Sequence, residues 1–352
     1  MTASFTYQIN PGRILFGPGI LEAVGDEIGR LGAKRALILS TPFQRADAQK
    51  LAGRIGSLAA GVFSEAATHT PVAVTLKAME AFEASGADCL VALGGGSTIG
   101  LGKAIAWRND APQIVVATTY AGSEATPILG QTENGVKTTV RDPKILPEVV
   151  IYDATLTIDL PVAMSVTSGL NAMAHAVEGV YARDRNPVSS LMAVQGVRAL
   201  RDALRVIVER ADDLPARTEA LYGSWLCGSV LGTVGMSLHH KLCHTLGGSF
   251  DLPHAETHAI VLPHSAAYNA QAAARELQPL GDLFGGEIGG GLYDFARSLG
   301  APLALKDLGL KEAQLDAAAD LAVKNPYWNP RPIEREAVRS LLQRAWEGAR
   351  PE

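Results

Sequence analysis

The order of apolar runs along the chain is the feature that most limits its fold. In the first half, short apolar runs alternate with longer stretches of amphipathic helical spacing. The expected strands are 36–39, 89–93, 114–117 and 148–152, and the expected helices lie near 42–58, 71–86 and 98–108. Strand–helix alternation is typical of a parallel sheet covered by helices on both faces. Asn134-Gly135, between two extended runs, adds a predicted hairpin turn.

The second half has a different pattern of apolar residues. Residues 161–245 are rich in Ala, Leu, Met and Val at helical spacing, and 271–350 reads as helices interrupted by the glycine segments 285–286 and 289–291, which we expect to form a loop. A chain of 352 residues favours two domains. We therefore predict an α/β domain with a parallel sheet over residues 1–156, followed by an all-α domain over residues 157–352.

Composition excludes several classes of protein. The chain is 47% hydrophobic and 19% charged, as a globular protein is. Its net charge is −5 and it has no block of Lys or Arg, so a nucleic-acid surface is not expected. No long apolar run predicts a membrane span, and residues 1–7 do not resemble a signal peptide. The three cysteines follow no spacing motif, which favours a reduced, cytoplasmic protein.

Two donor-rich turns predict a dinucleotide site in the first half. Gly94-Gly95-Gly96-Ser97 follows one apolar strand and precedes a helix, where glycines and the first helical amides can approach a phosphate closely. Thr118-Thr119 and Ser123 follow the next strand and would lie at the same sheet edge. An ordinary tight turn is the alternative for the glycines, because their spacing is not that of the usual fingerprint.

The turn after the strand 36–39 bears on which cofactor is used. Ser40-Thr41 stands where an acidic residue often binds the ribose 2′-hydroxyl of NAD. A neutral turn neither repels a 2′-phosphate nor rewards its absence, so we expect either NADH or NADPH to be accepted. Arg45 is a candidate partner for the 2′-phosphate.

Histidines concentrate in three segments of the second half. Asn171 and His175 are four residues apart, as are His240 and His244, so each pair would share one helix face. His254 follows Pro253 at an expected turn. Each histidine taken alone is more often a surface or core residue. Together, in segments of mostly packing residues, they look like a divalent-metal site without its anionic ligand.

These motifs resemble the iron-containing alcohol dehydrogenase family over nearly the whole chain. The resemblance rests on GGGS, TTYAGSE, SGLNAMAHAVE and HHKLCHTLGGSFDLPHAETHAIVLPH, and it is nearest to the maleylacetate reductase branch. It implies a nucleotide domain like that of dehydroquinate synthase, a helical second domain and a homodimer. In metal-dependent members the ligands are one aspartate and three histidines, whose positions fall here on Asn171, His175, His240 and His254.

The neutral Asn171 departs from the metal-dependent pattern. An amide is a poor ligand for a hard cation, so we expect no metal cofactor, although three imidazoles could bind zinc weakly. The branch implies NADH- or NADPH-dependent reduction of the C=C bond of maleylacetate to 3-oxoadipate, in the catabolism of aromatic compounds. We expect His240 and His244 nearest the substrate and His175 and His254 in support. Glu178 and Asp251 are candidates to orient them.

The substrate implied by the resemblance is a small dicarboxylate, which needs cationic partners. The candidates are Lys241, Lys137 and Arg331, with Tyr327 in the same Pro-rich loop as Arg331. Three alternatives remain: a metal-dependent alcohol dehydrogenase of the same family, a lyase on the dehydroquinate-synthase scaffold, and a noncatalytic nucleotide sensor.

Overall fold

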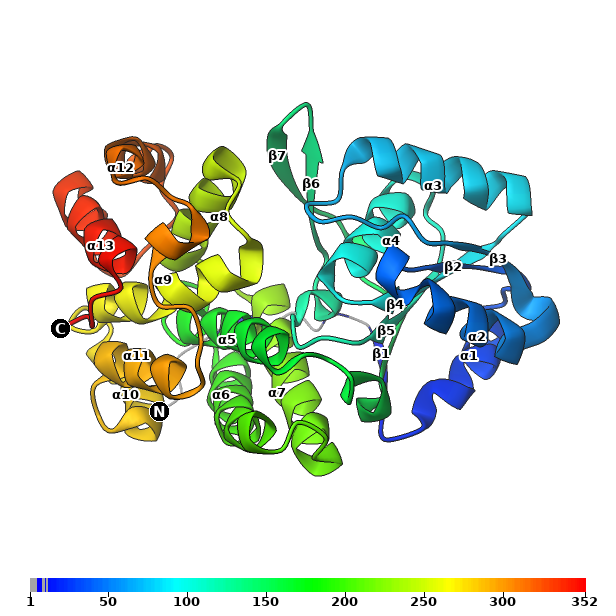
Figure 1. Ribbon diagram of the computed structural model, residues 1–352, viewed down its shortest axis with the longest axis horizontal. Coiled ribbons are helices and arrows are strands. Elements are labelled where there is room, and N and C mark those ends of the chain that lie inside the picture. The colour runs from blue at the N-terminus through cyan, green and yellow to red at the C-terminus, as the bar shows by residue number, and fades with distance from the viewer. Residues whose placement is uncertain (1–4, 8–9, 11) are drawn as a thin grey trace. The chain divides into compact units, whose positions relative to one another are not determined.

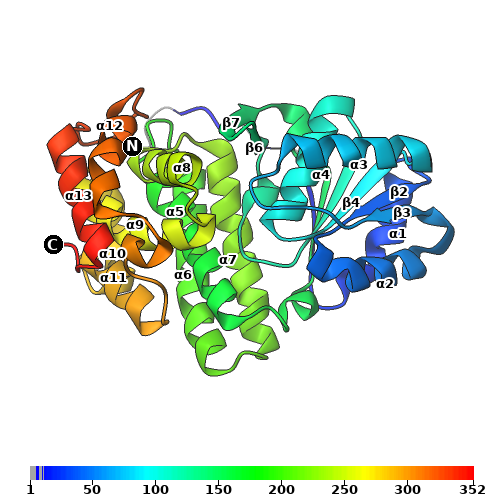
Figure 2. The ribbon, with the colours of Figure 1, turned by 45° about the horizontal axis from the view of Figure 1, so that its top comes forward.

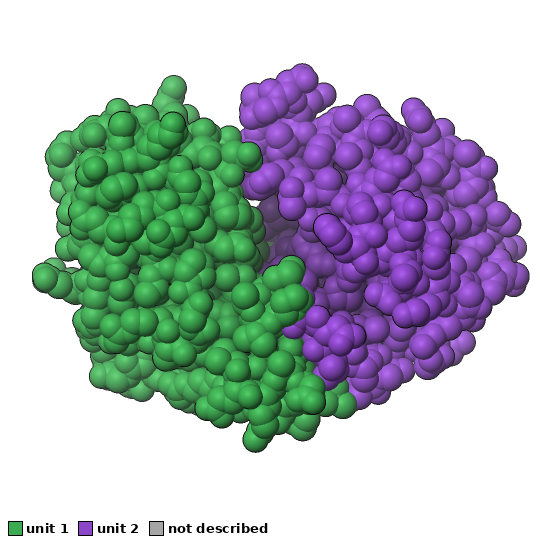
Figure 3. All heavy atoms as spheres, in the orientation of Figure 1, with its two compact units in different colours: residues 1–8, 161–352 green, residues 9–160 purple. Residues whose placement is uncertain are grey.

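A computed structural model describes residues 5–7, 10 and 12–352 of the chain. It divides into two compact units, Ile9–Leu160 and Pro161–Glu352, and residues 5–7 are grouped with the second (Figure 3). From the sequence we placed this division after residue 156. The expectation about a signal peptide depends in part on residues 1–4, which lie outside the described residues. In the described chain, no helix combines the length and apolar character needed to cross a membrane.

The unit Ile9–Leu160 is built on a six-stranded parallel sheet with the order β1-β8-β5-β4-β2-β3. Its strands are β1 (Arg13–Phe16), β2 (Ala36–Leu39), β3 (Ala59–Phe63), β4 (Cys89–Gly94), β5 (Gln113–Ala117) and β8 (Val149–Tyr152). Its helices are α1 (Val24–Arg30), α2 (Arg45–Ile55), α3 (Val72–Ser85) and α4 (Gly96–Asn109). The predicted strand–helix alternation is confirmed.

Helices cover both faces of this sheet, as Figures 1 and 2 show. On one face, α1 and α2 pack through Val24, Ile28 and Leu51 against side chains such as Ile38. On the other, α3 and α4 pack against side chains such as Leu37. Burial on both faces explains why β2, β4 and β5 read as continuous apolar runs.

The sequence did not reveal β1 and β3, which form the two edges of the sheet. Their residues are only partly buried, so they carry no continuous apolar run. The predicted hairpin is present as β6 (Ile128–Glu133) and β7 (Val136–Arg141), paired antiparallel. Asn134 and Gly135 have φ of 50° and 76°, the positive values that a two-residue turn of this kind requires.

The unit Pro161–Glu352 is helical, as predicted. Its helices are α5 (Val162–Gly179), α6 (Pro187–Glu209), α7 (Leu214–Thr233), α8 (Leu238–Phe250), α9 (His254–Asn269), α10 (Ala274–Gly281), α11 (Ile288–Ser298), α12 (Leu315–Val323) and α13 (Arg335–Glu347). Helix α5 packs against α6, α7 and α9, and α8 packs against α9 and α12 (Figure 1). Helix α5 is almost entirely buried, so its polar residues face other helices.

One prediction for this unit is wrong. Gly289, Gly290 and Gly291 do not form a loop but lie in the first turn of α11. Close packing explains the glycines: a Cβ at Gly289 would lie 2.5 Å from the Cβ of Ala267, and one at Gly291 would lie 2.3 Å from the carbonyl oxygen of Phe284. The glycines therefore let neighbouring segments approach the helix, and they do not break it.

Candidate active site

Six histidines from three helices form what we call the histidine cluster. They are His175 on α5, His239, His240 and His244 on α8, and His254 and His258 on α9. Neighbouring rings lie close together, with centroid separations from 4.3 Å for His254 and His258 to 6.3 Å for His175 and His258. The structure thus brings together the four histidines that the sequence singled out, and adds His239 and His258.

His240 lies at the centre of a hydrogen-bonded row. Its Nδ1 is 2.7 Å from Oε2 of Glu178, and its Nε2 is 2.9 Å from Nδ1 of His175. All three side chains are buried. Because a carboxylate only accepts, Nδ1 of His240 carries the proton, Nε2 is the acceptor, and His175 donates through Nδ1.

Glu178 also holds the beginning of α8. Its carboxylate oxygens accept from the backbone N–H groups of Ser237 at 2.8 Å and His239 at 2.6 Å. The first amides of a helix have no partner within the helix, and a negative charge is favoured there. Glu178 therefore fixes the helix that carries His240 as well as the ring itself. The sequence suggested an orienting role for Glu178 and Asp251; the structure places Asp251 at the C-cap of α8.

A second buried pair was not anticipated from the sequence. Nε2 of His239 is 3.0 Å from Nδ1 of His258, and Nδ1 of His239 is 3.1 Å from Oγ of Ser265. Burial, with smaller contributions from neighbouring imidazoles, holds the pKa of both histidines well below its usual value. Both rings are therefore neutral. The signal in the sequence was the spacing of His254 and His258, four residues apart on one helix.

His244 lies at the more open side of the cluster. It is half-buried, and its Nδ1 is 3.1 Å from the hydroxyl oxygen of Tyr327. The Nζ of Lys241 lies 5.9 Å from the centroid of the same tyrosine ring. Tyr327 thus contacts both His244 and Lys241.

The loop that carries Tyr327 is held by two hydrogen bonds between asparagine side chains. Nδ2 of Asn329 donates to Oδ1 of Asn269 at 2.7 Å, and Nδ2 of Asn269 donates back at 3.0 Å. Arg331 stacks over Tyr268, with 4.1 Å from its guanidinium carbon to the ring centroid. The guanidinium of Arg331 therefore helps to hold the loop in place. Arg331 is nevertheless exposed to solvent.

The residues at the family's metal position fit a hard divalent cation poorly. Asn171 is buried and offers a neutral oxygen, and this Oδ1 has no hydrogen-bond partner within the described chain. Nε2 of His240 already accepts from His175. His254 is exposed at the first position of α9, where the sequence predicted a turn. A site for such an ion would need a carboxylate and freely directed imidazole nitrogens.

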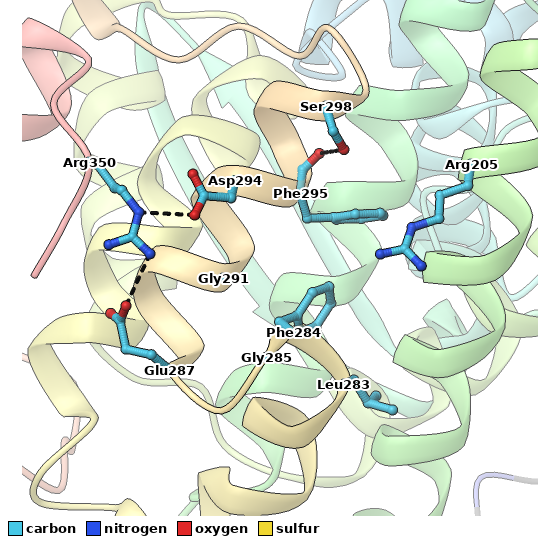
Figure 4. A pocket seen from close by; sticks show the side chains of 10 residues that line it. All are labelled: Arg205, Leu283, Phe284, Gly285, Glu287, Gly291, Asp294, Phe295, Ser298 and Arg350. Atoms are coloured by element: carbon cyan, nitrogen blue, oxygen red, sulfur yellow. Dashed lines mark hydrogen bonds and ion pairs between the residues drawn. The ribbon is translucent and has the colours of Figure 1, made fainter.

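A surface pocket of about 530 Å³ lies elsewhere on the helical unit (Figure 4). Its lining residues are Arg205, Leu283, Phe284, Gly285, Glu287, Gly291, Asp294, Phe295, Ser298 and Arg350. Arg350 binds the carboxylates of Asp294 and Glu287 across it, and Arg205 stacks on Phe295. No histidine lines this pocket and its charges are engaged, so we place the candidate active site at the histidine cluster.

The predicted phosphate-binding turn lies in the other unit, at the end of β4. Gly95 is the N-cap of α4, and the helix begins at Gly96. A Cβ at Gly95 would lie 2.7 Å from Cγ2 of Thr119, whereas a Cβ at Gly96 would meet nothing within 4 Å. The turn therefore packs against the second predicted loop and leaves open space at the helix N-terminus, which fits the phosphates of a dinucleotide.

A buried lysine anchors the loop after β5. Nζ of Lys103 donates to the carbonyl oxygen of Ser123 and, at 3.0 Å, to Oγ1 of Thr126. Burial lowers the pKa of Lys103 to about 7, although nearby Glu124 opposes this shift. The sequence analysis missed Lys103, because a lysine on a helix is ordinarily a solvated residue.

The turn after β2 meets the same loop through Gln44. Nε2 of Gln44 donates to Oγ1 of Thr118 at 3.0 Å, and Thr41 lies 3.5 Å from the amide oxygen of Gln44. Ser40 is buried and donates to Ser64, so its hydroxyl is already engaged. Arg45 is exposed at the beginning of α2. The predicted residues that follow β2, β4 and β5 are therefore neighbours at the carboxyl ends of these strands.

The nearby hairpin carries Lys137, which lies on β7 opposite Thr132. It belongs to the unit Ile9–Leu160, whereas the histidine cluster belongs to the helical unit.

Comparison with known proteins identifies relatives that match this chain over its full length. The chain is 66% identical over 348 residues to maleylacetate reductase of Rhizobium sp. (strain MTP-10005), covering 99% of each chain. It is 52% identical over 349 residues to maleylacetate reductase of Burkholderia cepacia, again covering 99% of each. A crystal structure of maleylacetate reductase from Agrobacterium tumefaciens matches with a TM-score of 0.96 and 66% identity, covering 99% of this chain and 100% of that one.

Family models cover both units. Residues 11–154 match the iron-containing alcohol dehydrogenase model, and residues 165–346 match the C-terminal model of the same family. Together with the full-length relatives, these matches decide the family. The chain belongs to the iron-containing alcohol dehydrogenase family.

Proposed function

We propose that this protein reduces the C=C bond of maleylacetate to 3-oxoadipate, with NADH or NADPH as the reductant, in the catabolism of aromatic compounds. Relatives that are 66% and 52% identical over their full length are named maleylacetate reductases. The observation that carries the proposal is the hydrogen-bonded row from Glu178 through His240 to His175, beside a neutral Asn171.

The reaction adds a hydride and a proton across an alkene conjugated to a ketone. The reduced nicotinamide supplies the hydride, which goes to the carbon beta to the ketone. Negative charge then develops on the ketone oxygen, and a proton must reach the alpha carbon. Hydrogen-bond donors fixed at that oxygen can stabilise the enolate without a Lewis acid.

The histidine cluster can supply both functions. We place His240 and His244 nearest the substrate, with His175 and His254 in support. Glu178 fixes the orientation of His240, so the ring need not reorganise during the reaction. His244 is half-buried and contacts the Tyr327 hydroxyl, which gives a proton donor at the open side of the cluster access to solvent.

We propose that the chemistry needs no metal cofactor. Asn171 provides an amide where the metal-dependent members of the family have a carboxylate, and the His175–His240 hydrogen bond occupies one imidazole nitrogen that would have to face the ion. Without a charged ligand, affinity for a hard cation is low.

The two carboxylates of the substrate need cationic or donor partners. We assign Lys241 and Tyr327 to one of them, because both lie beside His244. Arg331 and Lys137 remain candidates for the other. A bidentate guanidinium would suit a carboxylate, but Arg331 would first have to leave Tyr268.

Each of the two units has its own role in the proposed reaction. We propose that residues 157–352 bind the substrate and that residues 1–156 bind the dinucleotide. The proposed dinucleotide-binding residues are Ser40, Thr41, Gly94, Gly95, Gly96, Ser97, Thr118, Thr119, Ser123 and Lys137. We further propose a cytoplasmic homodimer. Cys89, Cys227 and Cys243 are buried and form no disulfide with one another, which fits a reducing compartment.

One assay tests the proposal directly. Purified protein should oxidise NADH only when maleylacetate is added, with 3-oxoadipate as the product, and a chelator should not lower the rate. Activity that a chelator abolishes and added metal restores would instead establish a metal-dependent alcohol dehydrogenase chemistry. Failure to oxidise NADH or NADPH with maleylacetate or any other enone or ketone would favour a lyase or a nucleotide sensor.

A further inference from the structure

Three buried side chains between α8 and α9 form a ligand set distinct from the family's metal position. They are His239 and Cys243, one helical turn apart on α8, and His258 on α9. One nitrogen from each histidine and the cysteine sulfur all lie within 4.8 Å of one another. Their exposed fractions are 0%, 2% and 0%, so the group lies in the protein interior.

The hydrogen bonds around His239 aim its lone pair at the other two residues. The hydroxyl of Ser265 donates to the carbonyl oxygen of Leu262 at 3.0 Å, so its oxygen accepts from Nδ1–H of His239. Nε2 of His239 is therefore unprotonated, and it lies 3.6 Å from Sγ of Cys243. Such a hydrogen bond to the far nitrogen is the usual way in which a ligating histidine is fixed.

His258 has a ring nitrogen without a partner. Its Nδ1 lies 3.0 Å from Nε2 of His239, while its own Nε2 is buried and has no hydrogen-bond partner within the described chain.

Two of the three separations are close to those around a tetrahedral zinc ion. With Zn–N bonds of about 2.0–2.1 Å and Zn–S bonds of about 2.3 Å, two ligating nitrogens lie about 3.3 Å apart and a nitrogen and a sulfur about 3.6 Å apart. The observed values are 3.0 Å between His239 and His258 and 3.6 Å between His239 and Cys243. The third separation, between His258 and Cys243, is within 4.8 Å, so a side-chain shift of about 1 Å would complete the tetrahedral geometry.

We propose that Nε2 of His239, Sγ of Cys243 and Nδ1 of His258 bind Zn²⁺ as a site of their own. A thiolate with two imidazoles favours a thiophilic ion over Fe²⁺ or Mg²⁺. Three protein ligands leave the fourth tetrahedral position for water or a small anion. The site goes beyond the proposed reduction and requires neither Asn171 nor His175.

Metal binding at this site would release one proton, and the site borders a residue that is exposed to solvent. Cys243 loses its thiol proton to the buffer, and His258 moves its proton from Nδ1 to Nε2, so one proton is released for each ion bound. His258 stacks on the exposed His254, with ring centroids 4.3 Å apart. The buried His258 is thus in contact with a residue that is exposed to solvent.

Cobalt(II) serves as the probe, because a thiolate ligand gives it an intense near-ultraviolet charge-transfer band. The metal-depleted full-length protein should gain this band on titration with Co²⁺, and Zn²⁺ should abolish it by displacement. Cys243→Ala should remove the band. Cys227→Ala, which replaces another buried cysteine on α7, should retain it and serves as the matched control.

X-ray absorption on the zinc-loaded wild type keeps the test independent of how the variants fold. The expected result is one sulfur neighbour at about 2.3 Å together with nitrogen neighbours. No uptake of either ion, an ion with nitrogen and oxygen neighbours only, or a band that persists in Cys243→Ala would overturn the proposal. None of these readouts depends on maleylacetate turnover, so the site and the proposed function can fail separately.

Discussion

Oε2 of Glu178 lies 2.7 Å from Nδ1 of His240, and the two residues come from helices α5 and α8. Both side chains are at most 4% exposed, so water does not compete for this hydrogen bond. The carboxylate sets the tautomer of His240 and, through backbone amides, the beginning of α8. Orientation of an imidazole by a buried carboxylate is the arrangement found in hydrolytic triads.

We expect His240→Ala and His244→Ala each to lower kcat for maleylacetate by about 10²–10³. For His244 this is the usual effect of losing one fixed donor to a developing oxyanion. The N–H of His240 is held by Glu178, so the loss of His240 acts through His175, which donates to it. Circular dichroism and NADH binding should stay close to those of the wild type, because the proposed nucleotide-binding residues lie in the unit Ile9–Leu160. Wild-type turnover in either variant would remove that histidine from the reaction.

Glu178→Gln should lower kcat by about 10²–10⁴, because the amide can present N–H to Nδ1 of His240 and reverse the tautomer. KM should change little, since Glu178 does not face the open side of the cluster. Nitrogen NMR of labelled histidine would report the tautomer directly. Glu256→Gln, in the first turn of α9, is the matched control, and an equal loss there would indicate a merely structural effect.

Asn171→Asp should raise the affinity for Fe²⁺ or Zn²⁺, because it returns a charged oxygen to a group of imidazoles. Anaerobic Fe²⁺ titration, followed by the rise in melting temperature, is the measurement, since iron is not expected at the thiolate site. Asn171→Ala removes the amide without adding charge and should show no gain. Equal iron affinity in both variants would mean that residue 171 does not face the cation.

NADH and NADPH should both support turnover, because the turn after β2 carries Ser40 and Thr41 where a ribose-binding carboxylate would stand. Steady-state kinetics with each cofactor should give kcat/KM values within about a hundredfold, which corresponds to about 2.7 kcal/mol. Arg45→Ala should lower kcat/KM for NADPH more than for NADH if Arg45 contacts the 2′-phosphate. A preference above that limit would contradict the reading of this turn.

Stability should fall on acidification below about pH 6.5. Burial, with Arg344 nearby, lowers the pKa of His264 from 6.5 to about 4. The unfolded chain therefore binds more protons between these values, so stability is complete above pH 6.5 and is lost as pH falls toward 4. By linkage His264 alone should account for about 2 kcal/mol at pH 5.

His239 and His258 act in the same direction, because their pKa values are also lowered. Urea unfolding of the wild type and His264→Leu at pH 8 and pH 5 would measure the His264 share. The leucine variant should lose less stability between the two values. Both imidazole nitrogens of His264 lack a hydrogen-bond partner in the described chain, so little should be lost at pH 8. An unchanged pH dependence would show that His264 is not the group responsible.

The sequence by itself determined the features that depend on neighbouring residues. Apolar runs predicted the inner strands β2, β4, β5 and β8, and helical spacing predicted the second unit, because periodicity records which face of an element is buried. Asn134-Gly135 specified its hairpin through backbone conformation. The four-residue spacings placed Asn171 with His175 and His240 with His244 for the same local reason.

Only the tertiary structure decided which side chains meet. His175 and His240 are 65 positions apart, and their hydrogen bond depends on how α5 and α8 are rotated and packed. The His239–His258 pair depends likewise on the packing of α8 against α9. The edge strands β1 and β3 were missed because their residues are only partly buried and carry no continuous apolar run. The glycines of α11 were misread because the reason for them is close packing against distant segments. Spacing along a helix fixes the direction of a side chain relative to its own axis, whereas its partner is set by long-range packing, which local periodicity does not encode.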